Sequence, residues 1–376
     1  MATQPDRQQA LRIGLGLAVA CALAFVASVV PQVRQIDSYW YTGLATQPII
    51  HGCPSIACFR VLVPWVLGLL PGVELKWRVY SVVFNALAGV AVFDLSLRFG
   101  LSRRASIIAM TLSAFGSQSL WTLFEPFNAD PLMFFLAPLV TRWLLEERIA
   151  IAFAVAAAGV LAKEFVVAPL AIVAIADAHA GRRRQALRIA GAAAGAFVIW
   201  VALHVSLIHW FGYNYSGGGN ASTRIFSGGY FWFWLTHQPL RASLAAQFVE
   251  FGAVYFLLPV GFLKAPRRLK ALAIASLPIA AVFCYVEQPD RALWNFHFLI
   301  SPLAALALEP LATPVAAAFV ALYAMANLRV GAQIPFVPEA RYTLAASTAI
   351  AVLAIVAGRR VVAFPHPGGT GTDAVV

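Results

Sequence analysis

The chain has 376 residues, of which 61% are hydrophobic and only 11% are charged, and its mean hydropathy is +0.78. An ordinary soluble domain is about 45–50% apolar and about 25% charged, so this composition excludes soluble globular, disordered and fibrous proteins. The apolar residues form continuous runs rather than the alternation of an outer-membrane barrel. We therefore expect an all-α, polytopic transmembrane bundle embedded in a lipid bilayer.

The formal net charge is +11, from 27 Lys and Arg against 16 Asp and Glu. No basic stretch is interleaved with aromatic residues on a polar face, so nucleic acid is not an expected partner. Basic residues mark the cytoplasmic loops of membrane proteins, and here they cluster at 182–184, 267–268 and 359–360. Placing these clusters on one side predicts about twelve spans with both termini in the cytoplasm.

The predicted spans are apolar runs that form one transmembrane domain over residues 1–360, followed by a disordered tail over 361–376. The first run is too long for the apolar core of a signal peptide, so it is kept as an uncleaved span. In chain order the runs are 11–31, 77–97, 105–122, 131–145, 149–161, 165–177, 190–210, 242–263, 271–286, 295–309, 311–328 and 341–358.

An acidic residue follows the first predicted span, in the aromatic sequence RQIDSYWY (34–41). If this segment is helical, Asp37 and Tyr41 share a face. A carboxylate at the membrane boundary could deprotonate an acceptor hydroxyl. A helix cap beside an interfacial aromatic belt explains the same residues equally well.

The rest of the first outer segment holds an apolar stretch and two cysteines. Residues 59–71 are too short and too rich in proline to span, so we expect an interfacial or re-entrant helix there. Arg60, at its start, either grips a phosphate or snorkels to lipid headgroups. A small disulfide between Cys53 and Cys58 is favoured, because a metal site with His51 lacks the spacing of a zinc knuckle.

A short acidic turn, EPFNADP (125–131), opens the span at 131–145. A polar residue before Pro131 is a good helix start, so capping is the favoured role of Asp130. The role of Glu125 stays open. Two acids and an asparagine could also hold a divalent cation through oxygen ligands.

Lys163 and Glu164 lie midway along an apolar stretch between Arg148 and Arg182, which are both predicted to be cytoplasmic. The stretch must therefore be a hairpin with these two residues at its outer tip. There the lysine could bind a phosphate or carboxylate while the glutamate balances its charge. A water-facing turn pair is the alternative. The short arms favour a tip recessed in a cavity.

The last outer candidates are Arg291 and His297. Arg291 either binds a ligand or forms a local ion pair with Glu287 or Asp290. A histidine in a helix, such as His297, more often satisfies an interior contact than acts as a base. The outer segment 211–241 is rich in Gly, Ser and aromatic residues, and loops of this length are usually functional or flexible.

Four of these motifs occur in the first half of the chain and share its outer side: DSYWY (37–41), FRVLVPW (59–65), NADP (128–131) and Lys163-Glu164. Together they resemble the GT-C superfamily of integral-membrane glycosyltransferases, which use polyprenyl-phosphate sugars. No soluble periplasmic domain follows, unlike in the larger members.

The resemblance implies a glycosyltransferase of the bacterial inner membrane and cell envelope, with its active site facing the periplasm. Its partners would be a polyprenyl-phosphate-linked sugar and a lipid or glycan acceptor. It also implies roles for individual residues. These are Asp37 as general base, Arg60, Lys163 and Arg291 as ligands of the donor phosphate, and Tyr41, His51, Glu125, Asp130, Glu164 and His297 in support.

A second acid beside Asp37 is absent, so no metal is assigned and a divalent cation stays open as a cofactor. The alternative function is a polytopic transporter or lipid flippase that uses the same charges as a relay. That function needs acids within the spans, where Asp94 and Glu250 are the only candidates and have no evident partner. The internal repeat expected of many transporters is also missing. An inactive scaffold is a third hypothesis.

Overall fold

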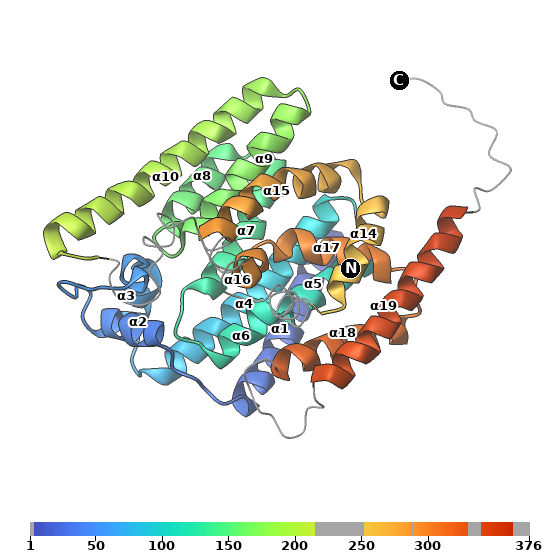
Figure 1. Cartoon of the computed structure of the whole chain (residues 1–376), viewed down its shortest axis with the longest axis horizontal. Helices are drawn as coiled ribbons and strands as arrows, with labels where there is room; N and C mark the ends of the chain where they lie inside the picture. Colours follow the sequence, from blue (N-terminus) through green and yellow to red (C-terminus); the bar gives the residue numbers. More distant parts are fainter. Residues whose placement is uncertain (1–3, 215–251, 287–288, 330–339, 364–376) are drawn as a thin grey trace.

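The structure is a computed structural model that describes residues 4–214, 252–286, 289–329 and 340–363. These residues form helices joined by short turns, and no β-strand occurs among them. The all-α expectation is therefore confirmed for the part of the chain that the structure describes. Figure 1 displays the helices packed side by side, with the long helix α10 along one flank and α18 and α19 on the other.

Every predicted span coincides at least in part with a helix. In chain order these helices are α1 (Gln4–Val29), α4 (Glu74–Arg98), α5 (Arg103–Ala114) with α6 (Ser117–Phe124), α7 (Asp130–Leu145), α8 (Ile149–Gly159), α9 (Ala168–His179), α10 (Arg183–Phe211), α14 (Val254–Lys264), α15 (Arg267–Val286), α17 (His297–Leu308), α18 (Thr313–Arg329) and α19 (Ala340–Ala363). The elements between them are α2 (Ile36–Thr46), the 3-10 turn η1 (Ile56–Phe59), α3 (Leu62–Gly68), the 3-10 turn η2 (Glu164–Val167) and α16 (Pro289–Trp294).

Four helical stretches are long and apolar enough to cross a membrane, namely Gln9–Val29, Glu74–Arg98, Arg103–Phe124 and Arg183–Phe211. In the first and last of them only 17% of the most apolar window is buried inside the protein. Apolar helices with so little internal packing need an apolar solvent, since burying their surface from water is strongly favourable. The architecture is thus compatible with a membrane protein.

The interior is built around α4, which packs against α1, α5 and α7. Several polar side chains inside it bond across helices. Asn85 Nδ2 of α4 donates to Thr122 Oγ1 of α6 at 2.7 Å, and Ser81 Oγ donates to the Thr122 carbonyl oxygen at 2.7 Å. Interhelical hydrogen bonds of this kind fix which helix faces meet in an apolar bundle.

The first outer segment differs from the single interfacial helix expected over 59–71. It contains the turn η1 and then α3, a helix of only seven residues that starts at Leu62 and has Pro64 in its first turn. Gly68 lies against the Ala45 carbonyl oxygen, where a Cβ would clash, so α2 and α3 pack backbone to backbone. Arg60 therefore sits in the connection between η1 and α3 rather than at the start of a helix.

Two other boundaries differ from the predicted ones. The span predicted at 105–122 is broken after Ala114, and α6 restarts with Gly116 as its N-cap, at a place where a Cβ would collide with Gln118. Helix α19 extends to Ala363, slightly beyond the expected boundary at residue 360. The rest of the predicted tail lies outside the described residues.

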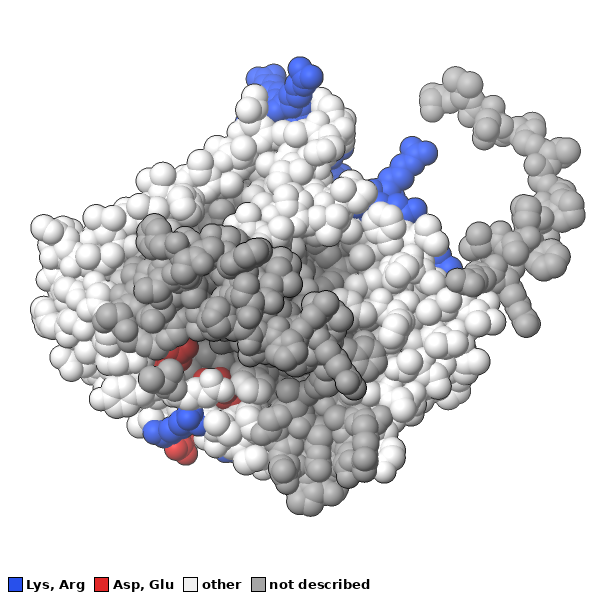
Figure 2. Space-filling model, viewed as in Figure 1, with Lys and Arg blue, Asp and Glu red and all other residues white. Residues whose placement is uncertain are grey.

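The two ends of the bundle carry different charges. Figure 2 displays Lys and Arg side chains alone over the α9–α10 and α14–α15 turns, and acidic side chains mixed with a basic one toward α2 at the other end of this face. At the basic end, Asp94 is bonded to Arg12 and to Arg142, each at 2.8 Å. The expectation that Asp94 lacks a partner is therefore wrong, because the two arginines come from helices distant in sequence.

Candidate functional site

Helix α2 carries two of the predicted site residues one turn apart, on a single face. Asp37 lies in its first turn, half-buried, where a carboxylate is stabilised by the positive end of the helix. Ser55 Oγ donates to Asp37 Oδ1 at 3.3 Å and so holds the carboxylate from outside the helix. The helix is capped by Gln35 together with Ser38, which leaves Asp37 free of the capping role considered for it.

Arg60 links α2 to the tip of the α8–α9 hairpin. Its Nη2 donates to Glu164 Oε1 at 2.8 Å and its Nε donates to Glu164 Oε2 at 3.3 Å, while Nη1 donates to the Tyr41 hydroxyl at 3.4 Å. The Arg60 side chain is only 12% exposed, against 29% for Glu164. Arg60 thus points inward and bonds both carboxylate oxygens of Glu164, so it does not snorkel to lipid headgroups, which was the alternative from the sequence.

Lys163 pairs with Asp130, at 2.7 Å between Nζ and Oδ1, and its side chain is only 3% exposed. The capping role predicted for Asp130 is wrong. Ala129 is the N-cap of α7, the Asp130 N–H donates to Asn128 Oδ1 at 3.0 Å, and the Asp130 carboxylate accepts from Lys163. Because Lys163 has an extended backbone and Glu164 begins η2, these neighbours reach different partners.

The charges of this cluster act on one another. Arg60, Asp130 and Asp37 all contribute to the potential at the Tyr41 hydroxyl, whose pKa is raised above its ordinary value mainly by burial. Burial also raises the pKa of Glu164, but Arg60 and Lys163 outweigh it and bring that pKa below the ordinary 4.5. Glu164 is therefore a carboxylate at neutral pH, and Tyr41 keeps its proton.

Glu125 is buried near the charged cluster and connects two helices there. Its Oε2 accepts from Trp121 Nε1 at 3.2 Å and its Oε1 accepts from Ser38 Oγ at 3.4 Å, so it ties α6 to α2. Its carbonyl oxygen accepts from Asn128 Nδ2 at 2.6 Å. Among the described residues no group of three or more His, Cys, Asp or Glu could hold a metal ion. The two acids of the 125–131 turn bond to different partners, Glu125 to Trp121 and Ser38 and Asp130 to Lys163.

The disulfide favoured by the sequence joins Cys53 and Cys58. Its loop is fixed to the end of α10, because the Gly52 N–H donates to the Phe211 carbonyl at 2.8 Å and the Asn214 N–H donates to the Cys53 carbonyl at 2.9 Å. His51 is exposed, with its ring 5.6 Å from that of Phe211. No described hydrogen bond or ion pair links His51 to the charged cluster.

Of the two remaining candidates, His297 stands apart from the cluster. His297 is buried between Ser113 Oγ, 2.8 Å from Nδ1, and the Phe134 carbonyl oxygen, 3.2 Å from Nε2, so it serves as an interior link between helices. Arg291 belongs to α16, which meets α6 through Trp294 and Trp121 at 6.4 Å between ring centroids. The Arg291 side chain itself lies outside the described part of the chain.

Sequence reasoning missed the residues that hold the charged ones in place. Ser55 and Ser38 contact Asp37 and Glu125, and the Tyr80 hydroxyl bridges the Ala129 carbonyl and the Leu132 N–H across the start of α7. Serines and tyrosines of this kind are too common along the chain to be singled out. Only the folded contacts identify them as supports.

No protein-family model and no curated protein matches the sequence.

Proposed function

We propose that the chain is a membrane glycosyltransferase of the GT-C type, which moves a sugar from a polyprenyl-phosphate carrier to a lipid or glycan acceptor. One observation carries the proposal. Charged and polar side chains from four separate segments meet in one network at one end of the bundle, and they are the ones the motifs singled out. The network comprises Asp37, Tyr41, Arg60, Asp130, Lys163 and Glu164.

The proposal includes an orientation in the bacterial inner membrane, with about twelve spans, both termini cytoplasmic and the charged network facing the periplasm. Two findings support it. The basic turns gather at the end of the bundle opposite to the network, as cytoplasmic loops do. The Cys53–Cys58 disulfide sits beside the network, and structural disulfides persist in oxidising compartments such as the periplasm.

The helix lengths support a recessed site. Helices α8 and α9 have 11 and 12 residues. At about 1.5 Å per residue each is roughly 17 Å long, near half of the ~30 Å apolar thickness of a bilayer. A hairpin that starts at the cytoplasmic surface then ends below the outer surface. Such a position limits access of bulk water, which competes with the acceptor for the sugar.

The chemistry needs a base, a cation and a shielded cavity. The acceptor hydroxyl oxygen attacks the anomeric carbon, and the bond from that carbon to the phosphate oxygen breaks. The departing polyprenyl phosphate keeps the electron pair, and the hydroxyl proton goes to Asp37. A half-buried carboxylate that Ser55 orients through one oxygen is suited to this task.

Of the two cations Arg60 and Lys163, Arg60 is the better candidate for contact with the donor phosphate. A guanidinium has five N–H donors, and the bonds of Arg60 to Glu164 and Tyr41 use three of them. Lys163 is buried and forms an ion pair with Asp130, so we propose that it positions the hairpin tip on α7. Arg291 and the 211–241 loop remain proposed for the donor and the acceptor.

Transport or lipid flipping has less support. A relay needs acids within the spans that can bind and release a charge. Asp94 is instead neutralised by two arginines, and Glu250 lies outside the described residues. No contact in the described part of the chain favours transport over sugar transfer.

The experiment is transfer of a radiolabelled hexose or pentose from polyprenyl phosphate to acceptors in membranes that contain the full chain. Asp37→Asn should lose roughly 10²- to 10⁴-fold in rate, as expected for removal of a general base. The control is Glu74→Gln, which removes an exposed acid paired with Arg34 near the start of α4 and should change the rate little. Equal rates in both variants would contradict the role of Asp37. Absence of transfer by the wild type with each supplied donor would contradict the function.

A further inference from the structure

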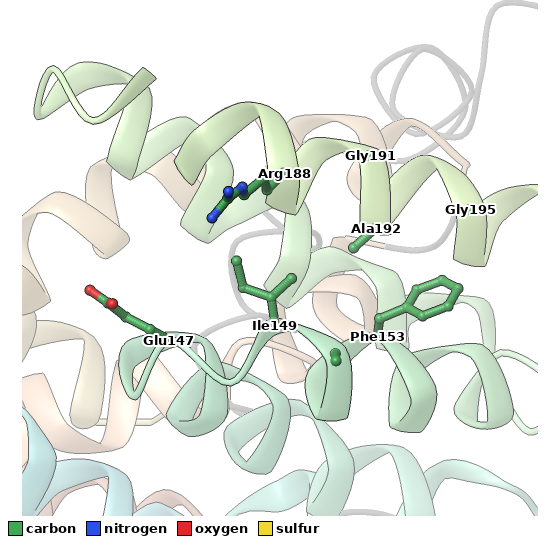
Figure 3. Close-up of a pocket in the computed structure, with 8 residues that line it drawn as sticks. Glu147, Ile149, Phe153, Arg188, Gly191, Ala192 and Gly195 are labelled. Carbon is green, nitrogen blue, oxygen red and sulfur yellow. The ribbon is translucent and has the colours of Figure 1, made fainter. Parts of the chain in front are cut away.

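A groove runs between α8 and α10, at the end of the bundle opposite to the charged network. Its apolar half has a volume of about 570 Å³, between Ile149 and Phe153 of α8 and the small residues Gly191 and Gly195 of α10. Figure 3 displays Ile149 and Phe153 facing these small residues, with Arg188 and Glu147 at one end of the groove. A Cβ built on Gly191 would meet no atom within 4 Å, so the groove has free space beside this glycine.

The groove continues into a basic half of about 450 Å³, which shares Glu147, Ile149 and Arg188 with the apolar half. Four arginines line this basic half, at positions 182, 183, 184 and 188. Arg182 is paired with Asp177, but no ion pair engages Arg183, Arg184 or Arg188 among the described residues. Glu147 is the one acid of the lining. Three arginines without an ion-pair partner against one carboxylate leave an excess of positive charge.

We propose that this groove binds an anionic phospholipid of the cytoplasmic leaflet. The arginines take the headgroup phosphate, and an acyl chain lies along Ile149, Phe153 and Gly191. The two halves follow each other as the headgroup and acyl chain of a phospholipid do. The basic half lies toward the end of the bundle, and the apolar half lies toward its middle. Gln185 Nε2 in the basic half is buried and has no hydrogen-bond partner among the described residues, so an arriving acceptor would satisfy it.

The surroundings favour a lipid over a soluble anion. Helix α10 exposes large apolar side chains along its length, such as Leu187 at 74% and Val198 at 64%, so the groove opens beside a surface suited to acyl chains. Basic clusters near the cytoplasmic leaflet attract anionic lipids electrostatically. The inference rests on the proposed orientation of the bundle and is independent of sugar transfer.

The experiment counts lipids retained by the purified full chain, using native mass spectrometry after transfer from nanodiscs of phosphatidylglycerol or phosphatidylcholine. Arg188→Gln removes a headgroup contact, and Gly191→Leu places a side chain in the groove, at a position where a Cβ has free space. Arg188→Gln should lower phosphatidylglycerol retention roughly tenfold, since a charge-assisted contact contributes on that scale. Gly191→Leu should also lower it, because the added side chain occupies the space proposed for the acyl chain. Phosphatidylcholine retention should stay low throughout, and soluble glycerol phosphate should not compete.

Matched controls separate a site from general attraction. Arg103→Gln removes an exposed arginine from the same end of the bundle, and Gly14→Leu enlarges an exposed helical glycine with equal free space. Both should retain phosphatidylglycerol like the wild type. Equal losses in Arg188→Gln and Arg103→Gln, no effect of Gly191→Leu, equal retention of the two lipids, or competition by glycerol phosphate would each overturn the proposal.

Discussion

At the residue scale, Arg60 is the side chain on which the charged network depends. It joins three segments, because its guanidinium lies in a connection and reaches both the α2 helix and the hairpin tip. A lysine could keep the charge but could not make the two-pronged contact with Glu164. Removing either partner of a pair this sheltered leaves an uncompensated charge, which is more costly than the loss of a surface ion pair.

The Arg60–Glu164 pair predicts a pH dependence of stability. The pKa of folded Glu164 lies below its ordinary 4.5, so its stabilisation is complete above that value and disappears as pH falls through the folded pKa. The gap in thermal stability between the wild type and Glu164→Gln should therefore be constant from neutral pH to about pH 5 and should close in more acidic buffer. Unfolding in detergent across this range measures it.

Glu74→Gln is the control for this titration. The Arg34–Glu74 pair has side chains that are 56% and 59% exposed, so its loss should have little effect at any pH. A wild-type advantage over Glu164→Gln that persists undiminished below the folded pKa would contradict the assignment of Glu164 as the ionised partner of Arg60.

The candidate site residues could be predicted only up to their type and their common end of the bundle. The motifs predicted that Asp37, Arg60 and Lys163 lie at one end, because hydropathy and charge bias are local properties of the sequence. The pairings could not be predicted, since Lys163 and Glu164 find partners 33 and 104 positions away. The interior contacts of His297 likewise depend on helices far apart in the chain.

At the scale of elements, the apolar runs predicted the helices well and their interruptions poorly. In lipid, the backbone N–H and C=O groups of an apolar run must hydrogen-bond within the run, so the run forms a helix. The break between α5 and α6 depends on tertiary packing around Gly116. Only Leu62–Gly68 of the range 59–71 forms a helix, and this helix, α3, packs on α2.

Helices α14 and α17 pack so closely that one glycine is required between them. A Cβ on Gly261 would overlap the backbone of Leu303, and a backbone cannot move aside as a side chain can. Gly261→Ala should lower the free energy of unfolding by about 3 kcal/mol, at the upper end of overpacking effects. Gly14→Ala, at an open helical position, should be neutral or slightly stabilising. Equal melting temperatures for Gly261→Ala and the wild type would contradict this close contact.

At the scale of the whole molecule, the two ends have different chemistry. The end with the charged network also carries the disulfide, and the opposite end carries the basic turns and the groove between α8 and α10. An asymmetry of this kind is what the positive-inside rule expects of a protein inserted in one orientation.

The orientation predicts which end is reachable from outside the cell. In a background without the free cysteines Cys21 and Cys284, a membrane-impermeant maleimide should label Gln47→Cys in intact cells. Arg183→Cys, at the start of α10, should react only after permeabilisation. The bonded pair Cys53–Cys58 should not react in either case. Labelling in the reverse order would invert the topology and place the network in the cytoplasm.

The most direct measurement of the central claim is mass spectrometry of the lipids that co-purify with the wild type and with Asp37→Asn. Without its base the variant should bind the donor but not turn it over, so a polyprenyl phosphate or its glycosylated form should accumulate on it. The mass of that lipid would identify the donor sugar. If no such lipid binds either protein, even when supplied, glycosyl transfer is contradicted and transport becomes the function to test.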